Sequence, residues 1–308
     1  APNAIEIKAE LGTVYLLLRD FPRAEACFSQ VLATAPDHTA TLHNLGNLLK
    51  LQGNPVEALK LLTRARVLAP HFLPTFYLYI STLLELERYQ QAYDELMEIK
   101  QLVGDKAEVE HGIATALQKL DRPYEALPYY HSALRLLATD ANTWDNLGTC
   151  QQELSEYTEA RRCYDKAIEL APANPVPRWH RSLLNLLTGR YAEGWSEYEL
   201  RLQGVDYAYR QHPFPQWSGE NLTNKAILVY AEQGIGDEIM FSSCIPDLMS
   251  QAREVIIECT PKLAPIFQRS FPKATVFGVD QKTASPWIRE WTKKIDYCIP
   301  IGSLPSHF

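Results

Sequence analysis

The chain has 308 residues, of which 46% are hydrophobic and 22% are charged, a balance that is typical of folded globular proteins and excludes a disordered one. Its net charge of −7 argues against a nucleic-acid partner, since nucleic-acid binding usually needs a basic surface. No apolar run approaches the roughly 18 residues that span a bilayer, and the N-terminal sequence APNAIEIK lacks the layout of a signal peptide.

From residue 5 to residue 208 the sequence repeats with a period of 34 residues that needs no insertion or deletion. Each period holds two stretches in which apolar residues recur at helical spacing. One such hairpin cannot bury its apolar face alone, so the repetition predicts a solenoid of stacked hairpins. The six units are 5–38, 39–72, 73–106, 107–140, 141–174 and 175–208.

The fifth unit shows the pattern most clearly. Gly148 and Ala160 fall where two antiparallel helices would touch, and Pro172 stops the second helix. Large residues fill the volume around that contact, namely Trp144, Leu147, Tyr157 and Tyr164. This arrangement resembles the tetratricopeptide repeat. The resemblance implies a mostly α-helical superhelical solenoid that binds a protein or peptide.

Three units depart from the pattern. The third places Ile80 where glycine is usual, and the fourth has Ala114 there. The sixth carries Arg181 and Ser182 at packing positions and Gly194 in place of alanine. Because the end of a solenoid must cover an exposed apolar face, we expect the sixth unit to be a terminal repeat adapted to a different neighbour.

Residues 209–225 show neither a helical nor a strand period and are predicted to be a linker. A flexible tether would be polar, whereas this segment and the residues just before it contain several aromatic side chains. They indicate that the linker packs against the protein, and they are Tyr207, Tyr209, Phe214 and Trp217.

Residues 226–308 change to alternating strands and helices. The apolar runs AILVYAE, EVIIECT, KATVFGV and IDYCIPIG are predicted strands, and EIMFSSCIPDLMSQA and PKLAPIFQRSF are predicted helices. Such alternation implies parallel βαβ units with right-handed crossovers. We therefore expect a partial Rossmann-like α/β domain after the solenoid.

The run ILVYAEQGIGDEIMF resembles the start of the N-terminal domain of GT-B glycosyltransferases, especially the ADP-heptose:lipopolysaccharide heptosyltransferase family. Together with the repeats, two further short segments resemble bacterial glycosyltransferases that contain tetratricopeptide repeats. These segments supply Gly194, Trp195, Tyr198, Glu199, Arg201, Trp217 and Gly219. The resemblance implies a nucleotide-sugar donor as substrate and no cofactor. A GT-B enzyme needs two Rossmann domains, so we expect this stretch of chain to be inactive by itself.

By this resemblance Asp237 is the candidate general base, and Gln233, Gly234 and Gly236 are the candidate substrate-binding residues. A carboxylate after the first strand would face the crevice where open α/β sheets bind ligands. The alternative is that Asp237 only caps a helix beginning at Glu238. A G-x-G turn without a third glycine is weak support for dinucleotide binding.

The concave face of the solenoid is the second candidate site. Asparagine carries both a donor and an acceptor and can clamp the backbone of an extended peptide. The alternative is an ordinary solvated polar face. The predicted groove residues are His43, Asn44, Asn47, Lys50, Tyr77, His111, Gln118, Asn142, Asp145, Asn146 and Gln152.

No metal site is expected, because the eight histidines show no ligand spacing with one another or with cysteine. The six cysteines form no C-x-x-C pair and are expected to be reduced in a cytoplasmic protein. A partial sheet leaves an unpaired edge, which predicts a homodimer through residues 226–308.

Two functions remain open. In the first, the repeats present an acceptor protein or peptide to an attached glycosyltransferase. In the second, the chain is a non-catalytic interaction scaffold whose α/β part is a structural cap.

Overall fold

The computed structural model describes residues 2–203, 212–280 and 287–308. The chain divides into two compact units, Ala1–Leu170 and Ala171–Phe308. We call them the first and second units and describe each by itself.

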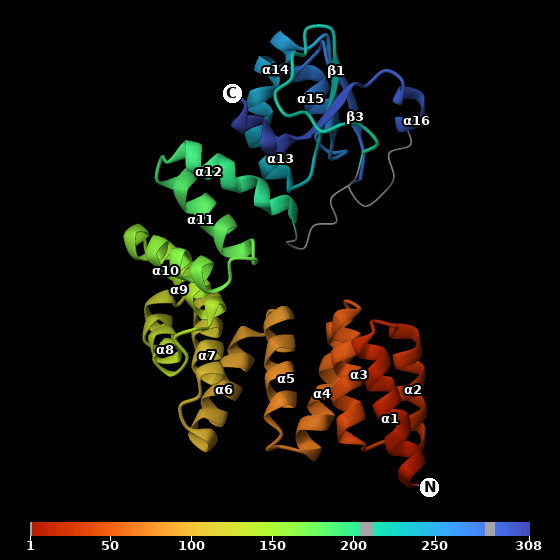
Figure 1. Ribbon diagram of the computed structural model, residues 1–308, viewed down its shortest axis with the longest axis vertical. Coiled ribbons are helices and arrows are strands. Elements are labelled where there is room, and N and C mark those ends of the chain that lie inside the picture. The colour runs from red at the N-terminus through yellow and green to blue at the C-terminus, as the bar shows by residue number, and fades with distance from the viewer. Residues whose placement is uncertain (1, 204–211, 281–286) are drawn as a thin grey trace. The chain divides into compact units, whose positions relative to one another are not determined.

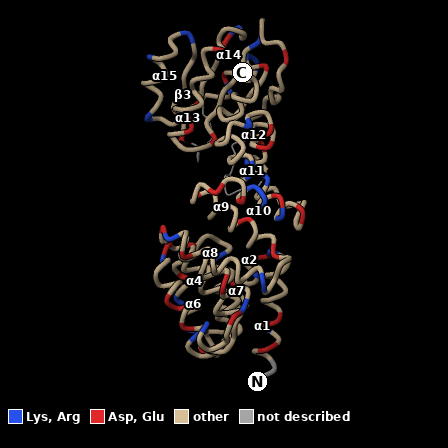
Figure 2. Tube along the Cα trace, turned by 90° about the vertical axis from the view of Figure 1, so that its left-hand side faces the viewer, with Lys and Arg blue, Asp and Glu red and all other residues tan. Residues whose placement is uncertain are grey.

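The first unit is a solenoid of helical hairpins, which confirms the prediction of two helices in each of the first five periods (Figure 1). Acidic and basic residues are interspersed along its helices (Figure 2). The helices are α1 (Pro2–Leu17), α2 (Phe21–Thr34), α3 (Thr39–Leu51), α4 (Pro55–Leu68), α5 (Leu73–Glu85), α6 (Tyr89–Val103), α7 (Ala107–Lys119), α8 (Pro123–Leu136), α9 (Ala141–Glu153) and α10 (Tyr157–Leu170).

The turn inside each hairpin has one backbone geometry. A residue with positive φ recurs at the same place in every period, and the next N–H bonds to the carbonyl five residues back, as in Asp20 to Tyr15 at 2.9 Å. This closure satisfies carbonyls that the helix end leaves unpaired. The positive-φ residues are Arg19, Gly53, Glu87, Asp121, Ser155 and Gly189.

Small residues let the two helices of a hairpin approach each other, as predicted for Gly148 and Ala160. Ala160 is fully buried, and a Cβ added at Gly148 would lie 2.6 Å from Cε1 of Tyr164. A Cβ added at Gly12 or Gly46 would lie 2.6 or 2.8 Å from the large side chain of the facing helix, Phe28 or Leu62. The hairpins therefore close around a contact that leaves no room for a methyl group.

We expect Gly148→Ala to destabilise the first unit by about 1–2 kcal/mol, because overpacking a core costs more than the helix propensity that alanine adds. Urea unfolding followed by far-ultraviolet circular dichroism measures this loss. Gly112→Ala is the matched comparison and should cost less, since its Cβ would lie 3.0 Å from Leu96 Cδ2, whereas the Cβ at Gly148 would lie 2.6 Å from a rigid ring. Equal losses of stability in the two variants would show that the clash with the Tyr164 ring is not what makes Gly148→Ala costly.

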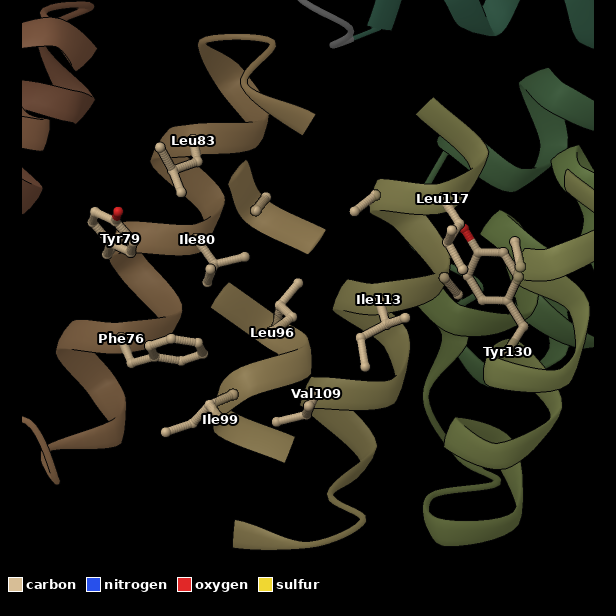
Figure 3. Packing of buried hydrophobic residues seen from close by; sticks show 14 of the residues in the cluster. Phe76, Tyr79, Ile80, Leu83, Leu96, Ile99, Val109, Ile113, Leu117 and Tyr130 are labelled. Carbon is tan, nitrogen blue, oxygen red and sulfur yellow. The ribbon is translucent and has the colours of Figure 1, made fainter. Parts of the chain in front are cut away.

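The third hairpin packs differently, because Ile80 occupies the place of the usual glycine. Leu96 of α6 lies between Ile80 on α5 and the α7 helix (Figure 3). It fits there because Gly112 of α7 has no side chain, and a Cβ at Gly112 would lie 3.0 Å from Leu96 Cδ2. The seam between the third and fourth repeats thus differs from the other seams.

The second unit begins with the hairpin α11 (Val176–Leu187) and α12 (Tyr191–Tyr198), followed by the 3-10 turn η1 (Glu199–Gln203). These are the helices of the sixth period. Their aromatic residues join the core of the α/β part, where Phe241 lies 6.2 Å from both Trp195 and Tyr198 between ring centroids.

Four parallel strands follow in the spatial order β3-β2-β1-β4, confirming the four predicted strands and their parallel pairing. The strands β1 (Ala226–Tyr230) and β2 (Glu254–Cys259) are buried almost throughout, as expected of central strands. The remaining elements are β3 (Thr275–Gly278), β4 (Tyr297–Pro300), α13 (Ile235–Phe241), η2 (Ser242–Cys244), α14 (Ile245–Gln251), α15 (Ala264–Ser270), α16 (Ile288–Trp291) and η3 (Ile301–Ser306).

The prediction of a single helix after β1 is wrong, because the structure has two helices, α13 and α14, separated by η2. The hydroxyls of Ser242 and Ser243 donate to carbonyls of the preceding turn, at 2.7 and 2.9 Å. Pro246 then lacks the N–H that a continuous helix would need. Together these features end one helix and begin the next.

The predicted linker packs against the sheet. Phe214 and Trp217 are buried, and the backbone of Pro215 and Trp217 exchanges hydrogen bonds with Cys298 of β4 at 2.8 and 2.9 Å. Tyr207 and Tyr209 lie outside the described residues. Because the linker pairs with β4, the unpaired edge expected of the sheet is not found on that side of the described structure.

Over the described ranges, none of the helices combines the length and the apolar character needed to cross a membrane.

Candidate functional site

The predicted groove residues lie on the first helices of successive hairpins, and we call the surface made by α1, α3, α5, α7 and α9 the first-helix face. Several of these side chains bond to the neighbouring repeat. Asn44 Nδ2 donates to Thr13 Oγ1 at 2.9 Å, and Gln118 Nε2 donates to Thr149 Oγ1 at 3.2 Å. The polar residues thus form a ladder that ties one first helix to the next.

The ladder includes both predicted histidines. His43 Nδ1 lies 3.1 Å from Thr75 Oγ1, and His111 Nδ1 lies 2.7 Å from Thr143 Oγ1. Asn146 Nδ2 lies 3.4 Å from the other ring nitrogen of His111. The face is therefore neither a set of free ligand groups nor a merely solvated surface, because many of its polar side chains form hydrogen bonds that join neighbouring repeats.

Other predicted groove residues are also occupied. Lys50 Nζ donates to Ser81 Oγ at 3.1 Å and lies 3.4 Å from a carboxylate oxygen of Glu85. Gln152 accepts the Tyr164 hydroxyl at 3.1 Å, and the Asp145 side chain is buried. Among the predicted groove residues, the side chains that form no hydrogen bond within the described structure are those of Asn47, Tyr77 and Asn142.

A cavity of about 370 Å³ opens on this face between α5 and α7. It brings together three of the predicted groove residues, and the other eight lie outside it. Its walls include Tyr77, Ile80, Leu84, Leu96, His111 and Asn142. The cavity lies at the unusual seam, where Ile80 and the Leu96–Gly112 contact replace the regular packing.

Burial lowers the pKa of His111, and this effect outweighs the attraction of the Asp140 carboxylate. The folded state therefore holds His111 neutral where the unfolded chain takes up a proton, which happens below about pH 6.5. It follows that His111 stabilises the fold above that pH and that this stability is lost as the pH falls.

We therefore expect His111→Gln to flatten the decline in stability between pH 7 and pH 5. Burial also lowers the pKa of His43, so part of the decline in stability should remain in His111→Gln. Denaturant unfolding at several pH values measures the slope. His131→Gln is the control because that side chain is exposed. An unchanged slope in His111→Gln would contradict the prediction.

The second unit has its own concentration of polar residues, at the carboxyl ends of β1 and β4. Arg201 from η1 is 1% exposed and donates to Glu232 Oε1, with Nη2 at 3.0 Å and Nε at 3.3 Å. Arg201 Nη2 also lies 2.8 Å from Ser303 Oγ, and the Gly302 N–H donates to the same Glu232 oxygen at 3.3 Å. The cluster joins the helical hairpin to two strands of the sheet.

Sequence reasoning missed Ser303 and assigned no role to Arg201 or Glu232, which appeared only inside segments that carry the family resemblance. A glutamate two residues after the end of a buried strand was the available signal. Burial raises the pKa of Glu232 despite the nearby Arg201. Its Oε2 atom is buried and has no hydrogen-bond partner among the described residues.

The predicted substrate residues lie beside this cluster. Gln233 bonds to the Tyr198 hydroxyl at 3.1 Å, and Asp237 Oδ2 accepts the Gly234 N–H at 3.2 Å. The helix begins at Ile235 and not at Glu238, so Asp237 is its third residue and reaches back to the cap position at Gly234. A Cβ added at Gly236 would meet no described atom within 4 Å, so the space beside this turn is open.

Comparisons with known proteins match the repeats and, in one case, most of the chain. A family model described as tetratricopeptide repeat matches residues 4–69 and 105–173. Protein FlbA of Caulobacter vibrioides is 27% identical over 304 residues, covering 93% of this chain and 51% of FlbA. The human protein O-mannosyl-transferase TMTC3 is 24% identical over 54% of this chain and 20% of its own length. The chain thus spans about half or less of these curated relatives.

Among solved structures, Pseudomonas aeruginosa PilF matches with a TM-score of 0.54 and 20% identity, over 66% of this chain and 94% of PilF. A chain of the APC/C Cut9–Hcn1 hetero-tetramer matches with a TM-score of 0.57 and 17% identity, over 64% of this chain and 39% of that chain. At these identities the likeness concerns the fold alone. The first unit is a solenoid of tetratricopeptide repeats.

Proposed function

We propose that this tetratricopeptide-repeat protein, a protein-interaction module, presents an acceptor protein or peptide to an attached glycosyltransferase that uses a nucleotide-sugar donor. The first-helix face would hold the acceptor. The second unit would form the beginning of a GT-B transferase domain of Rossmann-like type.

The observation that carries the proposal is the position of the glycine turn. The order β3-β2-β1-β4 reverses direction between β1 and β4, and Gly234–Asp237 lies at the end of the loop that joins β1 to α13 and in the first turn of α13. Open parallel sheets bind ligands in the crevice outside the carboxyl ends of their strands, at such a reversal. Asp237 is proposed as the general base, with Gln233, Gly234 and Gly236 against the substrate.

The two curated relatives add support of different kinds. The similarity to FlbA extends over 93% of this chain and so includes the second unit as well as the repeats. TMTC3 is named as a protein O-mannosyl-transferase, which is compatible with sugar transfer to a protein.

The test compares cells that have the complete natural gene with cells that lack it. Proteins captured by the purified repeat protein are identified, and their intact masses are measured from both kinds of cell. We expect a captured protein to carry a sugar only where the gene is present, and the purified gene product to transfer that sugar from its nucleotide donor. Equal masses in both kinds of cell, with no transfer, would overturn the proposal.

A non-catalytic scaffold is the second candidate, favoured by the way α12 shares a core with α13 and η3. In that case the α/β part covers the α11–α12 hairpin, and capture of a partner would occur without transfer. A homodimer through residues 226–308 and a cytoplasmic location also stay predictions. Light scattering over a range of concentrations checks the homodimer.

A further inference from the structure

We propose that the cavity between α5 and α7 receives an apolar side chain of the bound protein, and that a basic residue follows this side chain in the partner sequence. The inference rests on the proposed role of the first-helix face as the acceptor site. It adds the chemical class of the segment that is recognised.

The floor of the cavity selects an apolar group. Ile80, Leu84 and Leu96 lie in its wall, and their side chains approach from α5 and α6. Ile80 and Leu96 are nearly fully buried, so the hydrophobic surface is fixed in place. A leucine or methionine side chain placed here would leave water for an apolar pocket, which is the main source of affinity in such sites.

The rim supplies hydrogen bonds for a peptide backbone. The ladder uses most polar side chains of the first-helix face, but the Tyr77 hydroxyl and the Asn142 amide have no partner among the described residues. Both belong to the cavity wall, and they come from α5 and α9, on opposite sides of α7. An amide and a hydroxyl can bind N–H and C=O groups of an extended segment whatever its sequence.

The charge of the cavity selects the neighbouring residue. Its wall contains the carboxylates of Glu108 and Asp140 and no Lys or Arg. Glu108 is exposed and forms no ion pair within the described structure, whereas Asp140 accepts hydrogen bonds at the start of α9. Lys50 elsewhere on the face is paired with Glu85. A lysine or arginine is therefore attracted and a carboxylate is repelled.

The first experiment uses the full chain and three fluorescein-labelled nonapeptides in a Gly-Ser background, with central Leu-Lys, Ala-Lys or Leu-Glu. Fluorescence anisotropy measures binding. We expect the Leu-Lys peptide to bind and each of the others to bind at least about tenfold more weakly, because each loses one of the two selected groups. Equal binding of the three peptides, or binding of none, would overturn the inference.

Two pairs of variants locate the binding. Glu108→Lys is expected to reverse the preference between the Leu-Lys and Leu-Glu peptides, while the matched Glu25→Lys, on an exposed residue of α2, leaves it unchanged. Ala107→Trp fills the cavity from its rim and is expected to abolish binding. Ala141→Trp, at the same position of the next repeat and outside the cavity, is expected to have no effect. Binding that survives Ala107→Trp would also overturn the inference.

The outcomes separate this inference from the proposed function. If a protein is captured and glycosylated but Ala107→Trp and Glu108→Lys capture it as well as the unchanged protein does, only the cavity inference fails. If the Leu-Lys peptide binds as expected but no protein gains a sugar, only the transferase proposal fails. A shift toward monomer in Ala107→Trp by sedimentation would identify a second copy as the occupant and overturn the inference.

Discussion

Arg201→Met is expected to destabilise the second unit by about 3–5 kcal/mol, since it leaves the buried Glu232 carboxylate without its counter-ion. Glu232 is 5% exposed and already has one oxygen without a hydrogen bond in the described structure. Urea unfolding followed by tryptophan fluorescence measures the loss, because five of the six tryptophans belong to the second unit.

Two variants control for the loss of a cation and for the loss of the pair. Lys225→Met removes a cation of the second unit that is 44% exposed and pairs with Asp296 at 3.0 Å, and should cost much less stability than Arg201→Met, because exposed ion pairs contribute little. Arg201→Met combined with Glu232→Met should recover much of the stability, because an apolar pair avoids the burial of an isolated charge. A small loss of stability in Arg201→Met alone would contradict the role of Arg201 as the counter-ion of the buried Glu232 carboxylate.

The loss in Arg201→Met is also expected to depend on pH. Burial raises the pKa of Glu232, so the folded state binds this proton more tightly than the unfolded chain and is less stable at high pH. Removing Arg201 removes a charge that lowers this pKa. The penalty of Arg201→Met should therefore be smaller at pH 5 than at pH 8, and a penalty that grows toward low pH would refute this account.

Asp237→Asn is expected to lower sugar transfer by about 10²–10⁴-fold if Asp237 is the general base. The amide oxygen of asparagine can still accept the Gly234 N–H, so the turn and the start of α13 should be preserved. The variant is made in the protein expressed from its complete gene. Transfer rate and melting temperature are measured on the same samples.

Asp237→Ala separates the catalytic role from the capping role. Alanine removes both the base and the hydrogen bond, so its transfer should be lost and its melting temperature should fall. If Asp237 only caps α13, Asp237→Asn would transfer sugar at the normal rate, while Asp237→Ala would lose stability of about 0.5–2 kcal/mol. That pattern would remove Asp237 from the reaction.

The sequence could predict features that depend on local periodicity. The 34-residue frame gave the helices of the first five repeats, and short apolar runs gave the four parallel strands. The hairpin turn was not predicted as a motif, because only Gly53 and Gly189 carry the glycine that usually marks a positive φ. The other four turns place larger residues at positive φ, a backbone conformation that is less favourable for any residue with a Cβ than for glycine.

Contacts between distant residues could not be predicted from one sequence. Asparagine and histidine on the first-helix face suggest ligand binding, yet Asn44, His43 and His111 bond to the adjacent repeat. Arg201 and Glu232 are far apart in the chain and meet only because η1 packs over the sheet. The Arg201–Glu232 pairing has no periodic signal. The His43–Thr75 and His111–Thr143 bonds lie two periods apart, but the period alone does not show that these side chains bond to each other and not to a ligand.

The pairing of β4 has a consequence for the order of folding. β4 comes near the end of the described sequence, yet it pairs with β1 and with the linker at Pro215 and Trp217. Each helix of the first unit instead contacts helices one or two places away in the chain. Contacts between sequence neighbours form faster than contacts that close long loops. During synthesis the repeats should therefore fold on the ribosome, and an acceptor could engage them before the sheet is complete.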